Sequence, residues 1–276
     1  MRKSSLALLL TIVTLFPVSG DAGVPDGQVA TVSSAERLQG INPNQRPYRG
    51  YFLDLSGIAG RQNAASITEG LRHQIDIVEA VGLSPRVLNF FHTVPIVVDE
   101  LACLPQDDPK MLASACYGLA RSTLSQRTSH LVGTHWDNEK HQWANPDPVD
   151  FAEDTGLGVV MVRPVMMGGE EPLLLHELLH AFHAHVLPQG AKNPTLLLHY
   201  NAAKSQQLYP ADAYLLSNER EFFAVTASVF LYGKADKEPF TRANIKQKQP
   251  DYYKFLVWLF GFDPDRGPGA APVAVN

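Results

Sequence analysis

The sequence has only two cysteines, no block of basic residues and no apolar run long enough to cross a membrane. The 28 acidic residues outnumber the 23 lysines and arginines, and the resulting net charge of −5 argues against nucleic acid as the main partner. The apolar run at residues 6–18 is shorter than the roughly 20 residues that a membrane-spanning helix needs. Two thiols without a C-x-x-C pair argue against a cysteine-liganded zinc site.

The N-terminal apolar run is instead typical of a signal peptide. It follows the positive residues Arg2 and Lys3, and small residues come after it, so we predict cleavage near Gly20 or Ala22. We therefore expect residues 1–22 to be removed, and the chain to be secreted or periplasmic without a stable membrane anchor after cleavage.

Export changes the interpretation of the two cysteines, because disulfides persist outside the cytosol. Cys103 and Cys116 are close in sequence, and a bridge between them would stabilise the fold by roughly 3 kcal/mol in the chain-entropy model. We expect this bridge to form; two buried free thiols are the alternative.

The rest of the sequence predicts a single α+β domain, with a small twisted sheet in its first half and helices in its second half. Residues 23–46 are rich in glycine, proline and polar residues and predict a flexible leader, the domain itself covers 47–264, and 265–276 predict a disordered tail. Apolar periodicity predicts strands at 51–55 and 156–167, and one long strand or two short ones around Pro95 at 86–100. It predicts helices at 64–82, 109–121, 172–187, 218–232 and 250–260.

One predicted helix carries an unusual number of ionisable groups. Its sequence, GGEEPLLLHELLHAFHAHVLP at 168–188, is mostly apolar but contains four histidines. His176 and His180 are four residues apart, so both imidazoles project from one helix face about 6 Å apart along the axis, a spacing that fits a tetrahedral zinc ion. Glu177 beside them completes the H-E-x-x-H pattern of zinc hydrolases, in which the glutamate is a general base.

A catalytic zinc ion needs a third protein ligand, and the sequence offers several. The metzincin pattern is excluded, because it would need glycine at 183 and histidine at 186, where the chain has His183 and Val186. His185 is expected to face solvent or a polar neighbour. Asn218 predicts an N-cap, so Glu221, three residues later, is either a ligand or the second half of a capping box. The candidate third ligands are Asp212, Glu219, Glu221, His183 and His199.

The HELLH motif followed by EFFAVTASVF at 221–230 resembles the Mlc titration factor A family and the catalytic domain of anthrax lethal factor. The resemblance covers about 156–264 and implies a zincin-like metallopeptidase domain of the gluzincin type. It implies that His176, His180 and Glu221 hold one zinc ion, and that Tyr214, seven residues before Glu221, assists the reaction. The chain departs from the family pattern at His183, where aspartate is usual.

These observations together predict an exported zinc metallopeptidase that hydrolyses a peptide or protein substrate. Glu177 would take the proton from the attacking water, and Tyr214 would donate a hydrogen bond to the developing oxyanion. The strand at 156–167 would pair with an extended substrate. Two alternatives remain: a zinc-containing binding protein without catalysis, and a zinc hydrolase of a non-peptide amide such as one in a cell wall.

Overall fold

The computed structural model describes residues 45–98, 115–118, 135–137, 142–144, 158–164 and 169–267. The predicted signal peptide, most of the predicted leader and Cys103 lie outside these ranges, so cleavage and the Cys103–Cys116 bridge stay predictions. The described part begins in a strand at Gln45, within the predicted leader, and ends after a 3-10 turn, η5 (Pro264–Arg266), within the predicted tail.

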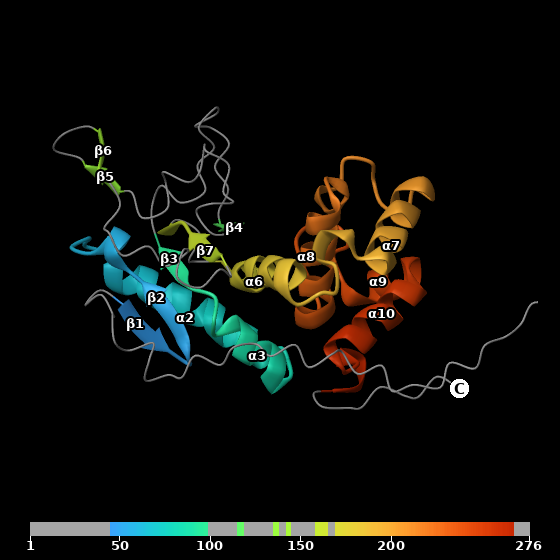
Figure 1. Ribbon diagram of the computed structural model, residues 1–276, viewed down its shortest axis with the longest axis horizontal. Coiled ribbons are helices and arrows are strands. Elements are labelled where there is room, and N and C mark those ends of the chain that lie inside the picture. The colour runs from blue at the N-terminus through green and yellow to red at the C-terminus, as the bar shows by residue number, and fades with distance from the viewer. Residues whose placement is uncertain are drawn as a thin grey trace, which may run out of the picture.

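The first half of the described chain forms a five-stranded mixed sheet (Figure 1). Its strands are β1 (Gln45–Tyr48), β2 (Tyr51–Asp54), β3 (Ile96–Val98), β7 (Val159–Val162) and β4 (Ala115–Gly118), in that spatial order. β2, β3 and β7 run parallel, whereas β1 and β4 run antiparallel to their neighbours. A separate pair consists of β5 (His135–Asp137) and β6 (Gln142–Ala144).

The turn between β1 and β2 explains why this sheet starts with a tight hairpin. Arg49 and Gly50 both have positive φ, at 47° and 91°, as the primed two-residue hairpin turns require. A Cβ atom on Gly50 would lie 3.0 Å from the His92 ring, so both the positive φ and the close contact favour glycine at this position.

Helix α2 (Ala64–Ala80) covers this sheet, and its apolar positions Ile67, Leu71, Ile75 and Val78 are buried, as predicted. The prediction of strand across 86–100 is wrong for its first part. Residues 85–91 form helix α3 (Pro85–Phe91), because Ser84 caps the Val87 amide and Pro85 fits the first helical turn. Only β3, after Pro95, is extended as predicted.

Two expectations, one about a helix and one about a strand, also need correction. The predicted helix at 109–121 is wrong at 115–118, which form β4 and pair with β7; the other residues of that range lie outside the described part. The predicted strand at 156–167 is confirmed at 159–162, which form β7, and this strand lies between β3 and β4. Because both its edges are paired, β7 is not available to an extended substrate.

The second half is helical, as predicted, with α6 (Leu173–His185), α8 (Glu219–Tyr232) and α10 (Pro250–Phe260) near the expected positions. Two further helices, α7 (Pro194–Ser205) and α9 (Arg242–Lys248), were not predicted. α6 lies between the sheet and the C-terminal helices (Figure 1) and packs against both α2 and α8. Its Phe182 stacks on Phe223 of α8 and contacts Phe260 of α10, which joins the two halves through one apolar core.

The mixed architecture confirms the α+β class. In the described part of the chain, every helix is too short or too polar to cross a membrane.

Candidate functional site

Helix α6 brings the two histidines of the motif together. His176 and His180 are one turn apart, and their Nε2 atoms are 3.1 Å from each other, with the rings nearly perpendicular. The neighbouring leucines of α6, Leu174, Leu175, Leu178 and Leu179, are fully buried. The apolar faces of the helix therefore fix its rotation and turn both imidazoles towards α8.

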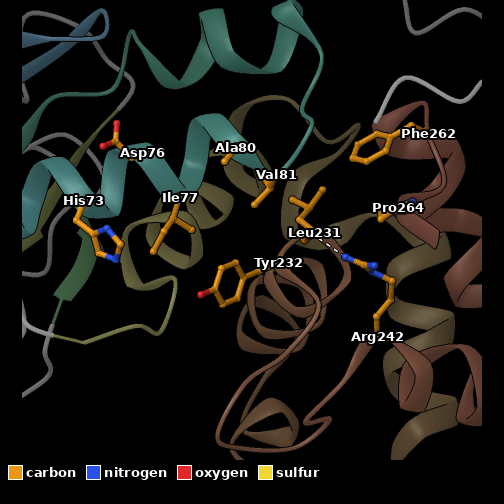
Figure 2. A pocket seen from close by; sticks show the side chains of 10 residues that line it. All are labelled: His73, Asp76, Ile77, Ala80, Val81, Leu231, Tyr232, Arg242, Phe262 and Pro264. Atoms are coloured by element: carbon orange, nitrogen blue, oxygen red, sulfur yellow. Dashed lines mark hydrogen bonds between the residues drawn. The ribbon is translucent and has the colours of Figure 1, made fainter. Parts of the chain in front are cut away.

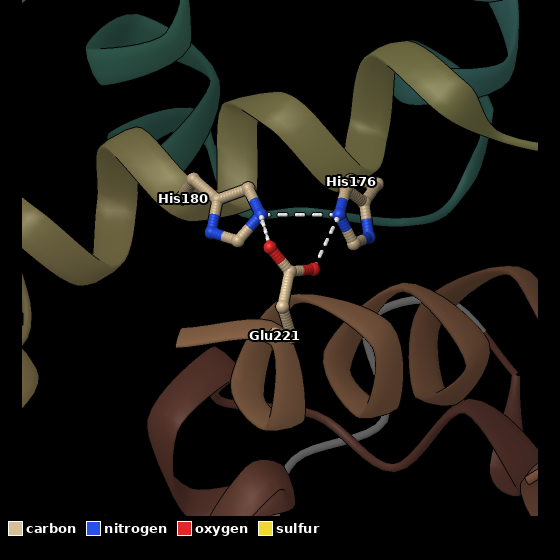
Figure 3. Close-up of side chains that lie close together, drawn as sticks. All are labelled: His176, His180 and Glu221. Carbon is tan, nitrogen blue, oxygen red and sulfur yellow. Dashed lines mark hydrogen bonds and ion pairs between the residues drawn. The ribbon is translucent and has the colours of Figure 1, made fainter. Parts of the chain in front are cut away.

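Helix α8 supplies a carboxylate to the same point. The Asn218 side chain caps this helix by accepting hydrogen bonds from the backbone amides of Arg220 and Glu221, each at 3.0 Å. The capped first turn directs Glu221 at the histidines: its Oε2 lies 3.3 Å from His176 Nε2 and its Oε1 lies 3.5 Å from His180 Nε2 (Figure 3). The predicted N-cap is confirmed, and the Glu221 carboxylate faces the histidines rather than closing a capping box.

The three side chains fit a zinc ion. Ligand atoms about 2.0–2.2 Å from a tetrahedral zinc ion lie roughly 3.3–3.6 Å apart, close to the separations seen between these side chains. Among the described residues, this is the one group of three or more His, Cys, Asp or Glu side chains with ligand atoms all within 4.8 Å. Glu221 Oε2 is buried and has no hydrogen-bond partner of good geometry in that part of the chain, as expected for an atom that holds a metal.

The charges of the three groups are coupled. Burial alone would raise the pKa of Glu221, but hydrogen bonds and charge from His176 and His180 outweigh it and hold that pKa well below its usual range. Burial alone would lower the pKa of His176, yet Glu221 and the nearby acids Glu177 and Glu171 raise it. The site therefore favours positive charge next to an ionised carboxylate.

Glu177 lies in the same turn and is 5% exposed. Burial raises the pKa of its carboxyl, whereas His176, His180 and the backbone amide of Tyr117, which donates a hydrogen bond, lower it. A carboxylate with a raised pKa next to a metal centre suits a general base that works near neutral pH. Tyr117 belongs to β4, and a backbone amide has no sequence signature, so the sequence did not reveal this contact.

Tyr214 opens the short 3-10 turn η4 (Tyr214–Leu216), just before α8. Its side chain is 48% exposed, and its hydroxyl has a raised pKa because of partial burial and because of the hydrogen bond and charge of Glu221. The structure therefore places the Tyr214 hydroxyl at the rim of the cluster, as a neutral donor at ordinary pH.

The other candidate ligands lie apart from the cluster. His183 is buried against the Phe223 ring, with 4.9 Å between ring centroids, and its Nε2 atom has no partner within the described residues. His185 is exposed and lies 2.7 Å from the Tyr117 hydroxyl, as expected for a histidine with a polar neighbour. His199 packs on Tyr252, Glu219 lies in the first turn of α8 without joining the cluster, and Asp212 is exposed.

Comparison with known proteins shows what this chain is similar to. Residues 122–259, half of the chain, match the family model described as anthrax toxin lethal factor, N- and C-terminal domain. A Pro-Pro endopeptidase from Paenibacillus alvei is 33% identical over 88 residues, which span 32% of this chain and 38% of the relative's length. A solved structure of a Pro-Pro endopeptidase from the same organism aligns with 73% of this chain and 95% of its own, with 20% identity and a TM-score of 0.41.

Proposed function

Because the chain belongs to the family of the anthrax toxin lethal factor N- and C-terminal domain, we propose that it is a zinc-dependent peptidase. The observation that carries the proposal is the convergence of His176, His180 and Glu221 from two helices, with Glu177 in the adjacent position. The resemblance to the Mlc titration factor A family and the gluzincin assignment of Glu221 are part of this proposal.

His176, His180 and Glu221 would hold the zinc ion, which when bound supplies Lewis acidity to the reacting carbonyl. Glu177 is the proton acceptor for the attacking water, because its buried carboxyl has a raised pKa and is held by the Tyr117 amide. The Tyr214 hydroxyl, at the rim of the cluster, is the donor to the developing oxyanion.

The substrate is an extended peptide in this proposal. Within the described residues, β4 is the edge strand nearest α6, and its backbone already contacts Glu177 through Tyr117. An extended peptide that pairs with β4 would pass close to the general base. Since one relative is named a Pro-Pro endopeptidase, peptides with two adjacent prolines are the first probes for this chain. Export by the predicted signal peptide would place the activity outside the cytosol.

Two other functions would use the same metal site: a zinc-containing binding protein without turnover, and a hydrolase of a cell-wall amide. The buried Glu177 and the Tyr214 hydroxyl at the rim speak against pure binding, because a structural zinc site needs neither a base nor an oxyanion donor.

The deciding experiment incubates the chain without residues 1–22 with a mixed peptide library that contains adjacent-proline peptides. We expect cleavage that stops with a chelator and returns with zinc. Bound zinc without cleavage of any peptide would reject the peptidase, and cell-wall fragments would then separate the two alternatives.

A further inference from the structure

The loop at residues 233–241, which joins α8 to α9, borders the candidate site. Two contacts place it there. The Asp236 backbone amide donates to Glu171 Oε1 at 3.1 Å, and Glu171 is close enough to His176 to raise the pKa of that imidazole. The Lys237 ammonium lies over the Tyr214 ring, 5.5 Å from its centroid, and Tyr214 contacts Glu221.

The loop is held in one shape by its own hydrogen bonds. Lys234 and Thr241 form an antiparallel bridge. The Ala235 amide donates a hydrogen bond to the Phe240 carbonyl at 2.8 Å, and the Phe240 amide donates one to the Lys237 carbonyl at 2.7 Å. Asn244 of α9 donates to the Pro239 carbonyl at 2.9 Å. Lys237 is therefore presented on a fixed turn and is not at the end of a freely moving segment.

Lys237 forms no ion pair with any described residue. The acids near it in sequence are directed elsewhere: the Glu238 carboxylate pairs with Lys248 at 3.6 Å, and no ion pair joins Asp236 to Lys237 within the described part. An exposed ammonium that rests on an aromatic ring keeps its charge and gains orientation from the ring. This cation is thus available to a molecule that enters the site.

We propose that Lys237 is a specificity-determining residue, which selects substrates with a carboxylate close to the scissile bond. The inference rests on the proposed peptidase function and deepens it by naming a substrate class. An extended peptide advances by about 3.3 Å per residue. The Lys237 ammonium lies over the ring of Tyr214, the proposed oxyanion donor, and can therefore reach substrate groups up to about three residues from the reacting carbonyl. The carboxylate belongs either to an Asp or Glu side chain or to the C-terminus of the substrate.

The test uses the peptide that the wild-type chain cleaves best in the library. One series, with amidated C-termini, carries Glu or Gln at each of three positions on either side of the scissile bond. A second series carries no acid but ends in a free or amidated carboxyl one to three residues after that bond. The quantity measured is the ratio of kcat/KM between the charged and the neutral peptide of each pair, for wild type, Lys237→Met, Lys237→Glu and the control Lys234→Met. Lys234 is exposed on the same loop.

We expect one position at which wild type prefers the charged peptide by about fivefold, the upper range for an exposed ion pair. Lys237→Met should bring this ratio to one, Lys237→Glu should bring it below one, and Lys234→Met should leave it unchanged. The series in which the preference occurs identifies the source of the carboxylate. The inference is overturned if wild type shows a ratio of one at every position. It is also overturned if Lys237→Met loses kcat/KM equally for charged and neutral peptides; in both cases the proposed peptidase function stands. Absence of any cleavage by wild type would overturn the proposed function, and this inference with it.

Discussion

Glu221 Oε2 on α8 lies 3.3 Å from His176 Nε2 on α6. Neither residue could reach this position without the packing of the two helices, which is fixed by Phe182 stacking on Phe223 two residues after Glu221. The Asn218 cap sets where α8 begins and therefore which acid in its first turn turns towards the histidines.

The first prediction concerns the two acids of that first turn. Residues two apart on a helix point about 200° away from each other, so Glu219 and Glu221 cannot share one role. Glu221→Ala should lose bound zinc severely, because it leaves two histidines as the only protein ligands. Glu219→Ala should keep the zinc content of wild type. Metal analysis of both purified variants measures the difference, and an empty site in Glu219→Ala beside a filled one in Glu221→Ala would refute the assignment.

Removal of one hydroxyl tests the role of Tyr214. Tyr214→Phe should retain zinc and lose about 100- to 1,000-fold in kcat, the effect typical of one oxyanion donor. Tyr48→Phe is a matched control, because its hydroxyl donates a hydrogen bond to Asp76 of α2 and not to a residue of the cluster. Steady-state kinetics with metal analysis distinguish the outcomes. An unchanged kcat in Tyr214→Phe would show that this hydroxyl does not contribute to the reaction.

His183 should make the metal-free protein sensitive to acid. Burial, with help from the charge of His180, lowers the pKa of His183 from 6.5 to about 4. The unfolded chain therefore takes up this proton first, so stability is lost as pH falls from 6.5 towards 4 and is unaffected above 6.5. At about 1.4 kcal/mol per pKa unit, the loss reaches about 3 kcal/mol at pH 4.

The measurement is urea unfolding of chelator-treated protein between pH 7 and 4. His183→Asn keeps a hydrogen-bond donor without a titrating ring, and its free energy of unfolding should vary about 3 kcal/mol less over this range than that of wild type. Equal pH dependence of the two proteins would contradict the assignment of this sensitivity to His183.

Local patterns were enough to predict much of this structure. The apolar spacing of α2 predicts which face of that helix is buried, and a pair of histidines four residues apart in the HELLH motif of α6 must share a face. The Asn218 cap was equally visible, because capping depends on a single side chain.

The failures have two physical causes: a local helix start that outweighs strand preference in one segment, and tertiary pairing that no local pattern reveals in the others. Val87, Phe90 and Phe91 are good strand formers, yet the Ser84 cap and Pro85 begin a helix there. The segment around Cys116 becomes β4 only because β7 offers an unpaired edge. For the same reason the sequence could not show that the Tyr117 amide reaches Glu177, or that Lys237 meets Tyr214.

The most direct test of the central claim is zinc content and peptide cleavage in Glu177→Gln, measured on the same preparation. The amide keeps the size of the side chain and removes its ability to accept a proton, whereas His176, His180 and Glu221 remain in place. The account predicts one zinc ion per chain, as in wild type, with no detectable cleavage of the wild-type substrate. Cleavage at the wild-type rate with the zinc ion bound would contradict it.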